Sequence, residues 1–498
     1  MRREAVRAEL VEAHSFHEVV KGKKALRQAQ GERRFWGGLV SAFALLAAPA
    51  AAQTVAITGG TVALGDGSEP IPGGTVVVRD GRIVAAGRGV AVPAGAQVVD
   101  ATGKWVTPGI VAGFSRIGLV EVDAVDATND VQANNSPFSA AIDVAPAVNP
   151  KAMPIAVNRA GGVTRAIVAP GSARSIFAGQ GAVIDLGADM NPITRARAFQ
   201  FVEFGETGAR DAGGSRASMH VLFRNALREA RDISRYAGIP SGGGAPRQAR
   251  ANDQRDLPLE EVPNNQGLLG SNVNRPQDVL LTRFDAAALV PVLQGRQLLL
   301  VHVERAADIL QTLALRKEFP NLRLVLVGAA EGWTVAHDIA AAGVPVIASA
   351  LTDLPNTFEQ LASTESNIGR MRAAGVRVSI GMIDDEEARQ VRLERQYAGN
   401  LVAVGRVPGG TGLSWGQALE AITSAPAEAV GLGGEIGSLK PGRRADVVVW
   451  DGDPLENSSA AVLVMIDGVQ QPLDNHQTKL RDRYRTPTEG DLPKAYQR

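Results

Sequence analysis

The sequence predicts an α/β fold, a (β/α)8 TIM-like barrel that carries a small β-sandwich formed from the N- and C-terminal segments. Apolar runs alternate with helix-prone segments from residue 298 to residue 405, as in parallel α/β architectures. Short β-prone runs with Gly-rich turns fill residues 54–106, and a similar stretch follows residue 444. The length of 498 residues can hold a barrel of roughly 250 residues and a second, smaller unit.

The N-terminal β-prone region contains a strong hairpin signal. Residues 76–78 and 83–85 are apolar and flank a turn with Asp80-Gly81 at its centre. Asp-Gly is typical of a two-residue hairpin turn, so these runs are expected to be antiparallel strands. Neither end of the chain has enough strands to close a sheet alone. We therefore expect residues 53–106 and 438–471 to pair into one composite β-sandwich.

Residues 107–437 are assigned to the barrel. The run LLLVHV at 298–303 is almost continuously apolar, as expected of a parallel strand covered on both faces, and the helix-prone ADILQTLALRKEF follows it. Upstream, GGVTRAIVAP and GQGAVIDLG add strand-like runs, which favours a closed barrel over an open sheet. Residues 358–375 and 386–405 are predicted helices. Residues 239–277 are rich in Gly, Pro, Asn, Arg and Asp and are predicted to be a loop insertion. Residues 472–498 form a polar C-terminal tail.

Residues 1–52 are interpreted as an N-terminal extension and a signal peptide. Arg33 and Arg34 precede an apolar stretch at 35–48, and Ala50-Ala51-Ala52 then supplies an A-x-A cleavage site. The mature chain is expected to begin at Gln53 and to be exported, to the periplasm. The apolar stretch is shorter than the ~20 residues that a membrane-spanning helix needs, so no stable membrane insertion is expected. Residues 1–32 make an unusually long basic region, for which a start codon placed too early is the alternative explanation.

The charge balance points to a small-molecule substrate or ligand. Lys plus Arg and Asp plus Glu number 52 each, which gives no overall field for nucleic acid or an anionic membrane. The absence of cysteine excludes disulfides, thiolate zinc sites and cysteine nucleophiles. No feature of the sequence indicates an oligomeric state.

Four segments resemble the amidohydrolase superfamily, and in particular its imidazolonepropionase-like exported subgroup. They are VTPGIVAGF at 106–114, the GGVTRAIVAPG and SIFAGQGAVIDL runs within 161–186, VHVERAADI at 301–309, and PAEAVGLGGEIGSLKPGRRADVVVWDGDP at 426–454. The last is nearly the closing signature of the family, where the barrel returns to the sandwich. The resemblance implies a hydrolase of carbon–nitrogen bonds. It also implies a divalent metal such as zinc at the C-terminal mouth of the barrel, which would activate water for attack.

The resemblance also implies that most metal-binding positions are vacated. Phe114 and Arg116 stand where the family has His-x-His on strand one. Phe has no lone pair, and Arg is always protonated and would repel a cation. The His of strand six is also missing, because Gly328 or Ala329 lies near its position. Four histidines follow residue 53, namely His220, His302, His337 and His476.

Three candidate site residues remain. His302 lies at the C-terminal end of a predicted barrel strand, and Glu304, two residues on, points to the same side. Asp384 matches the catalytic acid/base of the family and is the third candidate metal ligand. The alternatives are a hydrogen-bonded core histidine at position 302 and a helix N-cap at position 384. A further hypothesis is that Arg116 reaches Glu304 or Asp384 and fills the vacant metal site with an internal ion pair.

Two functions are compatible with these residues. The resemblance favours a hydrolase of carbon–nitrogen bonds with a degenerate metal site around His302 and Asp384. The ligand count favours a catalytically inactive, metal-free relative that acts as a periplasmic ligand-binding protein. A catalytic zinc ion normally has three protein ligands, and the sequence reaches three only if Glu304 is one of them.

Overall fold

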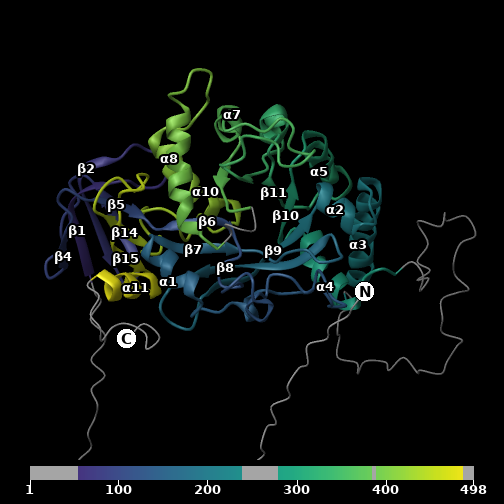
Figure 1. Cartoon of the computed structure of the whole chain (residues 1–498), viewed down its shortest axis with the longest axis horizontal. Helices are drawn as coiled ribbons and strands as arrows, with labels where there is room; N and C mark the ends of the chain where they lie inside the picture. Colours follow the sequence, from purple (N-terminus) through teal and green to yellow (C-terminus); the bar gives the residue numbers. More distant parts are fainter. Residues whose placement is uncertain (1–53, 238–278, 384–388, 486–498) are drawn as a thin grey trace, which may run out of the picture. The chain divides into compact units, whose positions relative to one another are not determined.

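The computed structural model describes residues 54–237, 279–383 and 389–485 (Figure 1). The predicted signal peptide, the predicted loop insertion at 239–277 and the candidate Asp384 lie outside the described residues. In the described part of the chain, no helix is both long and apolar enough to cross a membrane.

The two ends of the described chain share one eight-stranded sheet. Its strands are β1 (Thr54–Val62), β2 (Ile71–Arg79), β3 (Arg82–Gly87), β4 (Gln97–Asp100), β5 (Trp105–Pro108), β14 (Val447–Trp450), β15 (Ala461–Ile466) and β16 (Val469–Gln470). Strand β14 pairs antiparallel with β5, and this pairing joins the C-terminal strands to the N-terminal ones. All eight strands are linked through hydrogen bonds into one continuous sheet rather than two separate ones.

The predicted hairpin is confirmed in this sheet. Strands β2 and β3 are antiparallel and are joined at Asp80 and Gly81. Both residues have positive φ, 52° and 72°, as the two central residues of a type I′ turn require. Gly supplies this conformation without strain, and Asp is among the few other residues that adopt it readily.

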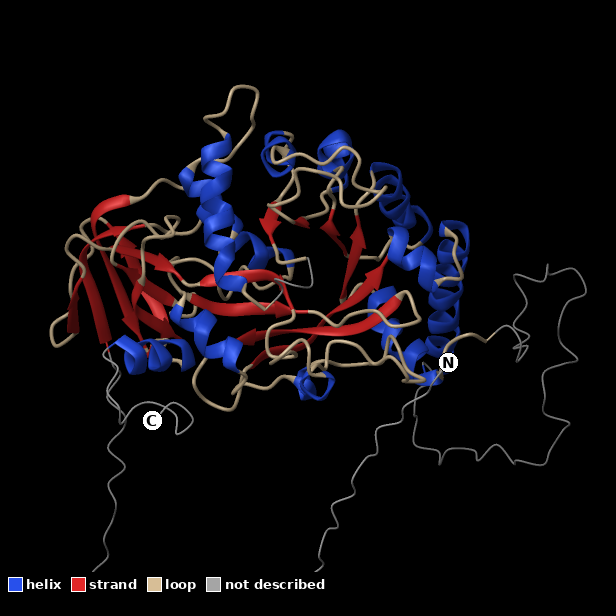
Figure 2. Ribbon diagram, in the orientation of Figure 1, coloured by secondary structure: helices blue, strands red, loops and turns tan. Residues whose placement is uncertain are grey.

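The second sheet forms a barrel (Figure 2). Its eight strands are β6 (Ile110–Ser115), β7 (Val163–Val168), β8 (Phe177–Asp185), β9 (Ile193–Glu203), β10 (Leu298–Val303), β11 (Leu324–Gly328), β12 (Val346–Ala348) and β13 (Val378–Ile380), which are neighbours in this order. The amide of Met382, just beyond β13, donates to the carbonyl of Phe114 in β6 at 3.0 Å. This bond brings the two edge strands together, so that the sheet is nearly closed.

One half of the barrel departs from the predicted (β/α)8 alternation. Strand β8 runs antiparallel to both β7 and β9. The connections, residues 169–176 and 186–192, are shorter than the roughly one dozen residues that a crossover between parallel strands needs. Strands β7 to β9 therefore form a meander. From β9 to β13 the strands are parallel, as predicted.

The helices follow the sequence pattern less closely than the strands. They are α1 (Met153–Ala160), α2 (Gly205–Asp211), α3 (Arg216–Ala237), α4 (Arg283–Leu293), α5 (Ala306–Glu318), α6 (Ala336–Ala342), α7 (Asn367–Ala373), α8 (Glu394–Val404), α9 (Trp415–Ala421), α10 (Ser424–Ala429) and α11 (His476–Arg485). Helix α5 follows β10 as predicted, and α3 and α4 lie side by side (Figure 1).

The helix predicted for residues 358–375 is wrong in its first half. Only α7 is helical there, and residues 358–366 form turns. Ser and Thr side chains compete for the backbone in this stretch: the Ser363 hydroxyl donates to the carbonyl of Gln360, and the Ser366 amide donates to Thr364. Glu359 is held by contacts with a different part of the chain, described below.

A buried arginine connects the barrel to the first sheet. The guanidinium of Arg165, in β7, is fully buried. It contacts Asp446 at 2.8 and 3.0 Å, Asp467 at 2.9 Å and Asp185 at 3.5 Å. Asp446 and Asp467 come from the C-terminal part of the chain, so this ion cluster fixes the returning chain to the barrel.

Candidate functional site

Two glutamates hold the imidazole of His302 at the C-terminal end of β10. Nδ1 of His302 lies 2.6 Å from Oε2 of Glu203, and Nε2 lies 3.0 Å from Oε1 of Glu304. Glu203 ends β9 and is the register partner of His302 across the two parallel strands. The side chains of His302, Glu203 and Glu304 are 21%, 10% and 8% exposed, so the imidazole retains a small opening to solvent.

The surroundings of His302 favour its protonated form. Burial alone would lower the pKa of His302, but the charge and hydrogen bond of Glu203 and those of Glu304 outweigh it, and the pKa is raised well above 6.5. An imidazolium ion donates from both ring nitrogens, which fits the two carboxylate contacts. The interpretation of His302 as a hydrogen-bonded histidine thus agrees with its contacts.

Glu203 is the functional residue that the sequence did not reveal. It follows the apolar run AFQFV, and the C-terminal ends of barrel strands are where functional side chains collect. That signal was weak, because β9 begins with the polar residues Thr194, Arg195 and Arg197, which interrupt the strand pattern.

Glu304 fills the space near the strand-six position. Its Oε2 accepts a hydrogen bond from the amide of Ala330 at 2.7 Å. Gly328, at the end of β11, has a φ of +90°, and a Cβ atom there would lie 2.3 Å from Oε1 of Glu304. A histidine at residue 328 would therefore collide with Glu304. Glycine at residue 328 and glutamate at residue 304 therefore fit together in one packing arrangement.

A second ion-pair cluster lies close to His302. Arg216 of α3 contacts Asp308 at 2.9 Å and Glu359 at 3.0 Å. Glu359 also accepts a hydrogen bond from the amide of Glu206 at 2.7 Å. Burial raises the pKa of Glu359, while the bond from Glu206 and the charge of His302 lower it. His302 and Arg216 thus supply the positive charge among several carboxylates.

Phe114 and Arg116, which the resemblance places at the strand-one metal positions, form a stack inside the barrel. The ring of Phe114 is 1% exposed, and its centroid lies 5.2 Å from that of Phe201. The guanidinium carbon of Arg116 lies 4.9 Å from the Phe114 centroid and 5.6 Å from the Phe201 centroid, within the range of cation–π contacts. Arg116 also donates to the carbonyls of Ala169 and Pro170.

The hypothesis that Arg116 forms an internal ion pair with Glu304 or Asp384 stays a prediction; the Glu304 carboxylate contacts His302 and the amide of Ala330. The other partner considered, Asp384, lies outside the described residues. Arg116 is nevertheless a buried cation, 6% exposed, at a place where the resemblance expects a metal ligand.

Within the described residues, the side chains near His302 do not fit the divalent metal that the resemblance implies. In the described ranges, no group of three or more His, Asp or Glu side chains is arranged to hold a metal ion. A histidine that binds a metal must offer a nitrogen lone pair, and both nitrogens of His302 face carboxylates. Phe114 offers no lone pair, and Arg116 adds positive charge.

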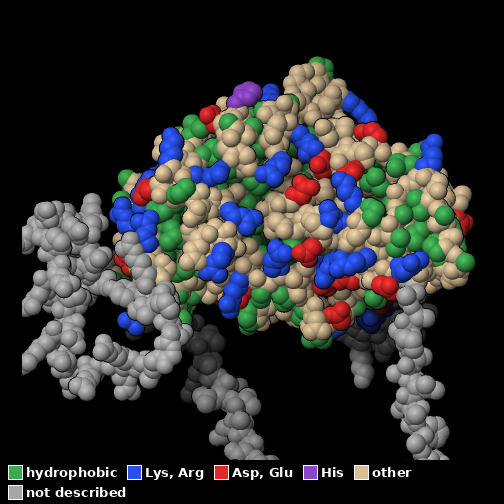
Figure 3. Space-filling model, turned by 180° about the vertical axis from the view of Figure 1, so that it is seen from behind, with side chains coloured by type: hydrophobic (Ala, Val, Ile, Leu, Met, Phe, Trp, Pro, Cys, Tyr) green, Lys and Arg blue, Asp and Glu red, His purple; other side chains and the backbone are tan. Residues whose placement is uncertain are grey.

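The other histidines lie apart from this group. His220, in α3, packs edge-to-face on Phe204 with ring centroids 5.4 Å apart, and burial lowers its pKa. His337 and His476 are exposed. On the face shown in Figure 3, basic and acidic side chains are interspersed.

Comparison with known proteins identifies the fold. Residues 323–470 match the model of the amidohydrolase family. An amidohydrolase of Thermotoga maritima MSB8 superimposes with a TM-score of 0.69 at 24% identity, over 84% of this chain and 99% of the other. The fold is that of the amidohydrolases. The "Amidohydrolase tasK" of Hapsidospora irregularis is 27% identical over 409 residues, which cover 76% of this chain, and the match spans only 38% of the length of that relative.

Proposed function

We propose that this chain is a member of the amidohydrolase superfamily, of its imidazolonepropionase-like exported subgroup, and that it hydrolyses a carbon–nitrogen bond of a small molecule. One observation carries the proposal. At the C-terminal end of the barrel strands, where this type of fold places its chemistry, a histidine lies between two glutamates. The match to the amidohydrolase family supports the choice of bond.

The three side chains can supply general acid–base catalysis without a metal. A glutamate, Glu203 or Glu304, accepts a proton from the water that attacks the substrate carbonyl carbon. The His302 imidazolium donates a proton to the nitrogen as the carbon–nitrogen bond breaks. The products are a carboxylic acid and an amine, and the imidazolium is restored when the proton held by the glutamate passes to His302 across the 2.6 or 3.0 Å contact.

A second candidate function is ligand binding without turnover. It is favoured by the stack of Arg116 on Phe114 and Phe201, which fills the part of the barrel where the resemblance expects metal. The two candidates share the fold and differ only in whether His302 and its glutamates carry out chemistry.

Metal analysis and turnover of the purified protein test the proposal. Zinc is measured by inductively coupled plasma mass spectrometry, and hydrolysis is measured on N-acyl amino acids, dipeptides and cyclic amides. The variant is His302→Gln, and the matched control is the exposed His337→Gln. Turnover without stoichiometric metal, lost in His302→Gln and kept in His337→Gln, would support acid–base hydrolysis. Stoichiometric zinc that is lost in His302→Gln would overturn the metal-free mechanism. The absence of turnover on every substrate would favour ligand binding.

Export of the chain is a separate proposal. The A-x-A site at residues 50–52 supports cleavage before Gln53. N-terminal sequencing of the protein from a periplasmic fraction tests it, and an uncleaved N-terminus in the cytoplasmic fraction would contradict it.

A further inference from the structure

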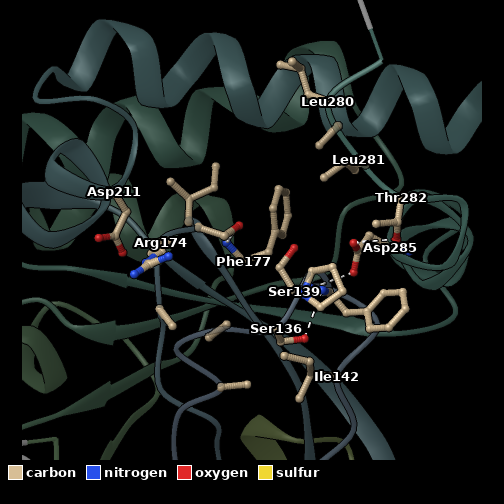
Figure 4. A pocket seen from close by; sticks show the side chains of 18 of the residues that line it. Ser136, Ser139, Ile142, Arg174, Phe177, Asp211, Leu280, Leu281, Thr282 and Asp285 are labelled. Carbon is tan, nitrogen blue, oxygen red and sulfur yellow. Dashed lines mark hydrogen bonds between the residues drawn. The ribbon is translucent and has the colours of Figure 1, made fainter. Parts of the chain in front are cut away.

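A cavity of about 280 Å³ lies beside α2 and α3 (Figure 4), and its lining does not include His302, Glu203 or Glu304. Four segments form its walls: residues 133–142, residues 171–178, one side of α2 and α3, and residues 280–285. Its volume is slightly below the range of sites for drug-sized molecules, about 300–1,000 Å³. A ligand of the size of an amino acid therefore suits it better than a polymer.

The floor of the cavity is apolar. Ile142, Phe177, Leu222, Ala226 and Leu281 line it, and Phe177 and Ala226 are almost fully buried. Phe177 projects into the middle of the cavity in Figure 4. This floor would take up an aliphatic or aromatic side chain by removing apolar surface from water.

At the rim of the cavity, apolar side chains are exposed to solvent. Phe138 is 41% exposed and Leu280 is 60% exposed, and both line the opening. A hydrophobic ligand seated on the floor would cover part of this surface. The rim therefore favours the same ligand class as the floor.

One wall carries two opposite charges. Arg174 lines the cavity, is exposed, and has no hydrogen bond or ion pair with any residue in the described part of the chain. Its backbone has a φ of 61°, an uncommon conformation for a residue with a side chain. Asp211, at the end of α2, has a side chain only 13% exposed; one carboxylate oxygen accepts a hydrogen bond from the hydroxyl of Ser172 at 3.1 Å, and the other lies 4.0 Å from Nε of the exposed Arg210. Ser172 precedes Arg174 by two residues, so both charges belong to the same wall.

The other acidic side chain of the cavity is already engaged. The carboxylate of Asp285 accepts hydrogen bonds from the amides of Ser139 and Ala141, both at 2.8 Å, and from the hydroxyl of Thr282 at 2.7 Å. Asp285 therefore fixes the segment at 139–141 against the start of α4. Arg174 and Asp211 remain as the groups that can meet a charged ligand.

We infer that this cavity is a binding site for a free hydrophobic amino acid. The carboxylate of the ligand binds Arg174, its ammonium group binds Asp211, and its side chain lies on the apolar floor. Charge-assisted contacts at both ends make the recognition specific for the zwitterion. The site contains none of the residues proposed for hydrolysis, so binding here does not depend on turnover.

Isothermal titration calorimetry of the full chain tests the inference. The probes are L-leucine and L-phenylalanine, compared with N-acetyl-L-leucine, which lacks the ammonium group, and L-leucine methyl ester, which lacks the carboxylate. We expect L-leucine or L-phenylalanine to bind, and the two blocked forms of leucine to bind at least tenfold more weakly than leucine.

Two variants locate the binding. Arg174→Gln should weaken the binding of the preferred amino acid at least tenfold, and so should Asp211→Asn, which keeps an oxygen for Ser172. The control is Arg195→Gln, because Arg195 is exposed, pairs with Glu435 and does not line the cavity. Circular dichroism melting curves establish that each variant is folded.

Three results would overturn the inference. They are the absence of binding by both free amino acids, equal binding of leucine and its methyl ester, and affinity unchanged in the folded Arg174→Gln variant. None of these results bears on hydrolysis, which depends on His302, so failure of this site and failure of the proposed function are distinguishable.

Discussion

Oε2 of Glu203 lies 2.6 Å from Nδ1 of His302, and this short contact joins the ends of two neighbouring parallel strands. A histidine that binds a metal through one ring nitrogen usually donates its other ring N–H to a carboxylate or a carbonyl, and Glu203 would suit that role. Here, however, the other ring nitrogen also meets a carboxylate, Glu304. The pair of contacts converts a potential metal ligand into a buried cation with a raised pKa.

Glu203→Gln should lower the pKa of His302, because the variant removes the carboxylate whose charge raises that pKa most. The folded pKa of His302 lies above its unfolded value of about 6.5, so its stabilising contribution is complete below that pH and is lost as the pH rises through the folded pKa. At pH 6 the variant should lose roughly 1–3 kcal/mol of unfolding free energy, a magnitude typical of hydrogen bonds to charged groups. Urea unfolding between pH 6 and 9 measures the loss.

The titration of His302 can be followed directly by NMR of histidine-labelled protein. Glu318→Gln serves as the control, because Glu318 lies on the surface of α5 and pairs with Arg224. The explanation fails if the titration midpoint of His302 is the same in Glu203→Gln and in the wild type.

Arg116→Ala should destabilise the protein by about 3–5 kcal/mol, the range for truncation of a large buried side chain to alanine. The change removes a buried cation that stacks on Phe114 and Phe201 and donates to two carbonyls. Arg116→Lys should recover only part of the loss, since an ammonium group has no planar face to lie on the rings. Thermal and urea unfolding give the values. Arg88→Ala, at an exposed position, should stay within about 0.5 kcal/mol of the wild type, and a comparable small effect at residue 116 would refute the assigned role.

Gly328→Ala should be more destabilising than Gly343→Ala by about 1–3 kcal/mol, the usual range for an overpacked site. Both glycines have positive φ, +90° and +64°, so both substitutions carry backbone strain. Only at residue 328 does the new Cβ meet another group, the Glu304 carboxylate, whereas residue 343 has open space around it. The difference between the two variants in urea unfolding isolates the collision, and Glu304→Ala combined with Gly328→Ala should reduce it. Equal losses at the two positions would contradict the packing argument.

Local signals predicted several elements correctly. The apolar run at 298–303 is strand β10 with the same bounds, because a strand buried on both faces needs a continuous apolar pattern. The hairpin at Asp80-Gly81 could be predicted from the sequence because its turn conformation depends on those two residues alone. The position of His302 at a strand end followed from the same run.

Features that depend on contacts between distant segments could not be predicted from the sequence. Glu203 meets His302 only because β9 and β10 pair in one particular register. The direction of β8 is set by the short connections on either side, whereas its own apolar pattern suits either direction. Residues 358–366 are not helical, and Glu359 within them is fixed by Arg216 and the amide of Glu206.

Asp185→Asn should change how stability depends on pH. Burial raises the pKa of Asp185 to about 6, and the charge of Arg165 only partly opposes this. A carboxyl group with a folded pKa above its unfolded value stabilises the protein while it is protonated, and that stabilisation is lost as the pH rises from about 4 through 6. The wild type should therefore lose roughly 1–3 kcal/mol from this group between pH 4 and pH 7, at about 1.4 kcal/mol for each unit of pKa shift. Asp185→Asn should lack this component.

Urea unfolding of the wild type and of Asp185→Asn at pH 4, 5, 6 and 7 measures the difference. Asp338→Asn is the control, because Asp338 is exposed on α6 and takes no part in the ion cluster of Arg165. The unfolding free energy of Asp185→Asn should increase relative to that of the wild type as the pH rises. A difference that is independent of pH would mean that Asp185 stays ionised in the folded protein and that Arg165, with Asp446 and Asp467 already bound to it, holds all three carboxylates as anions.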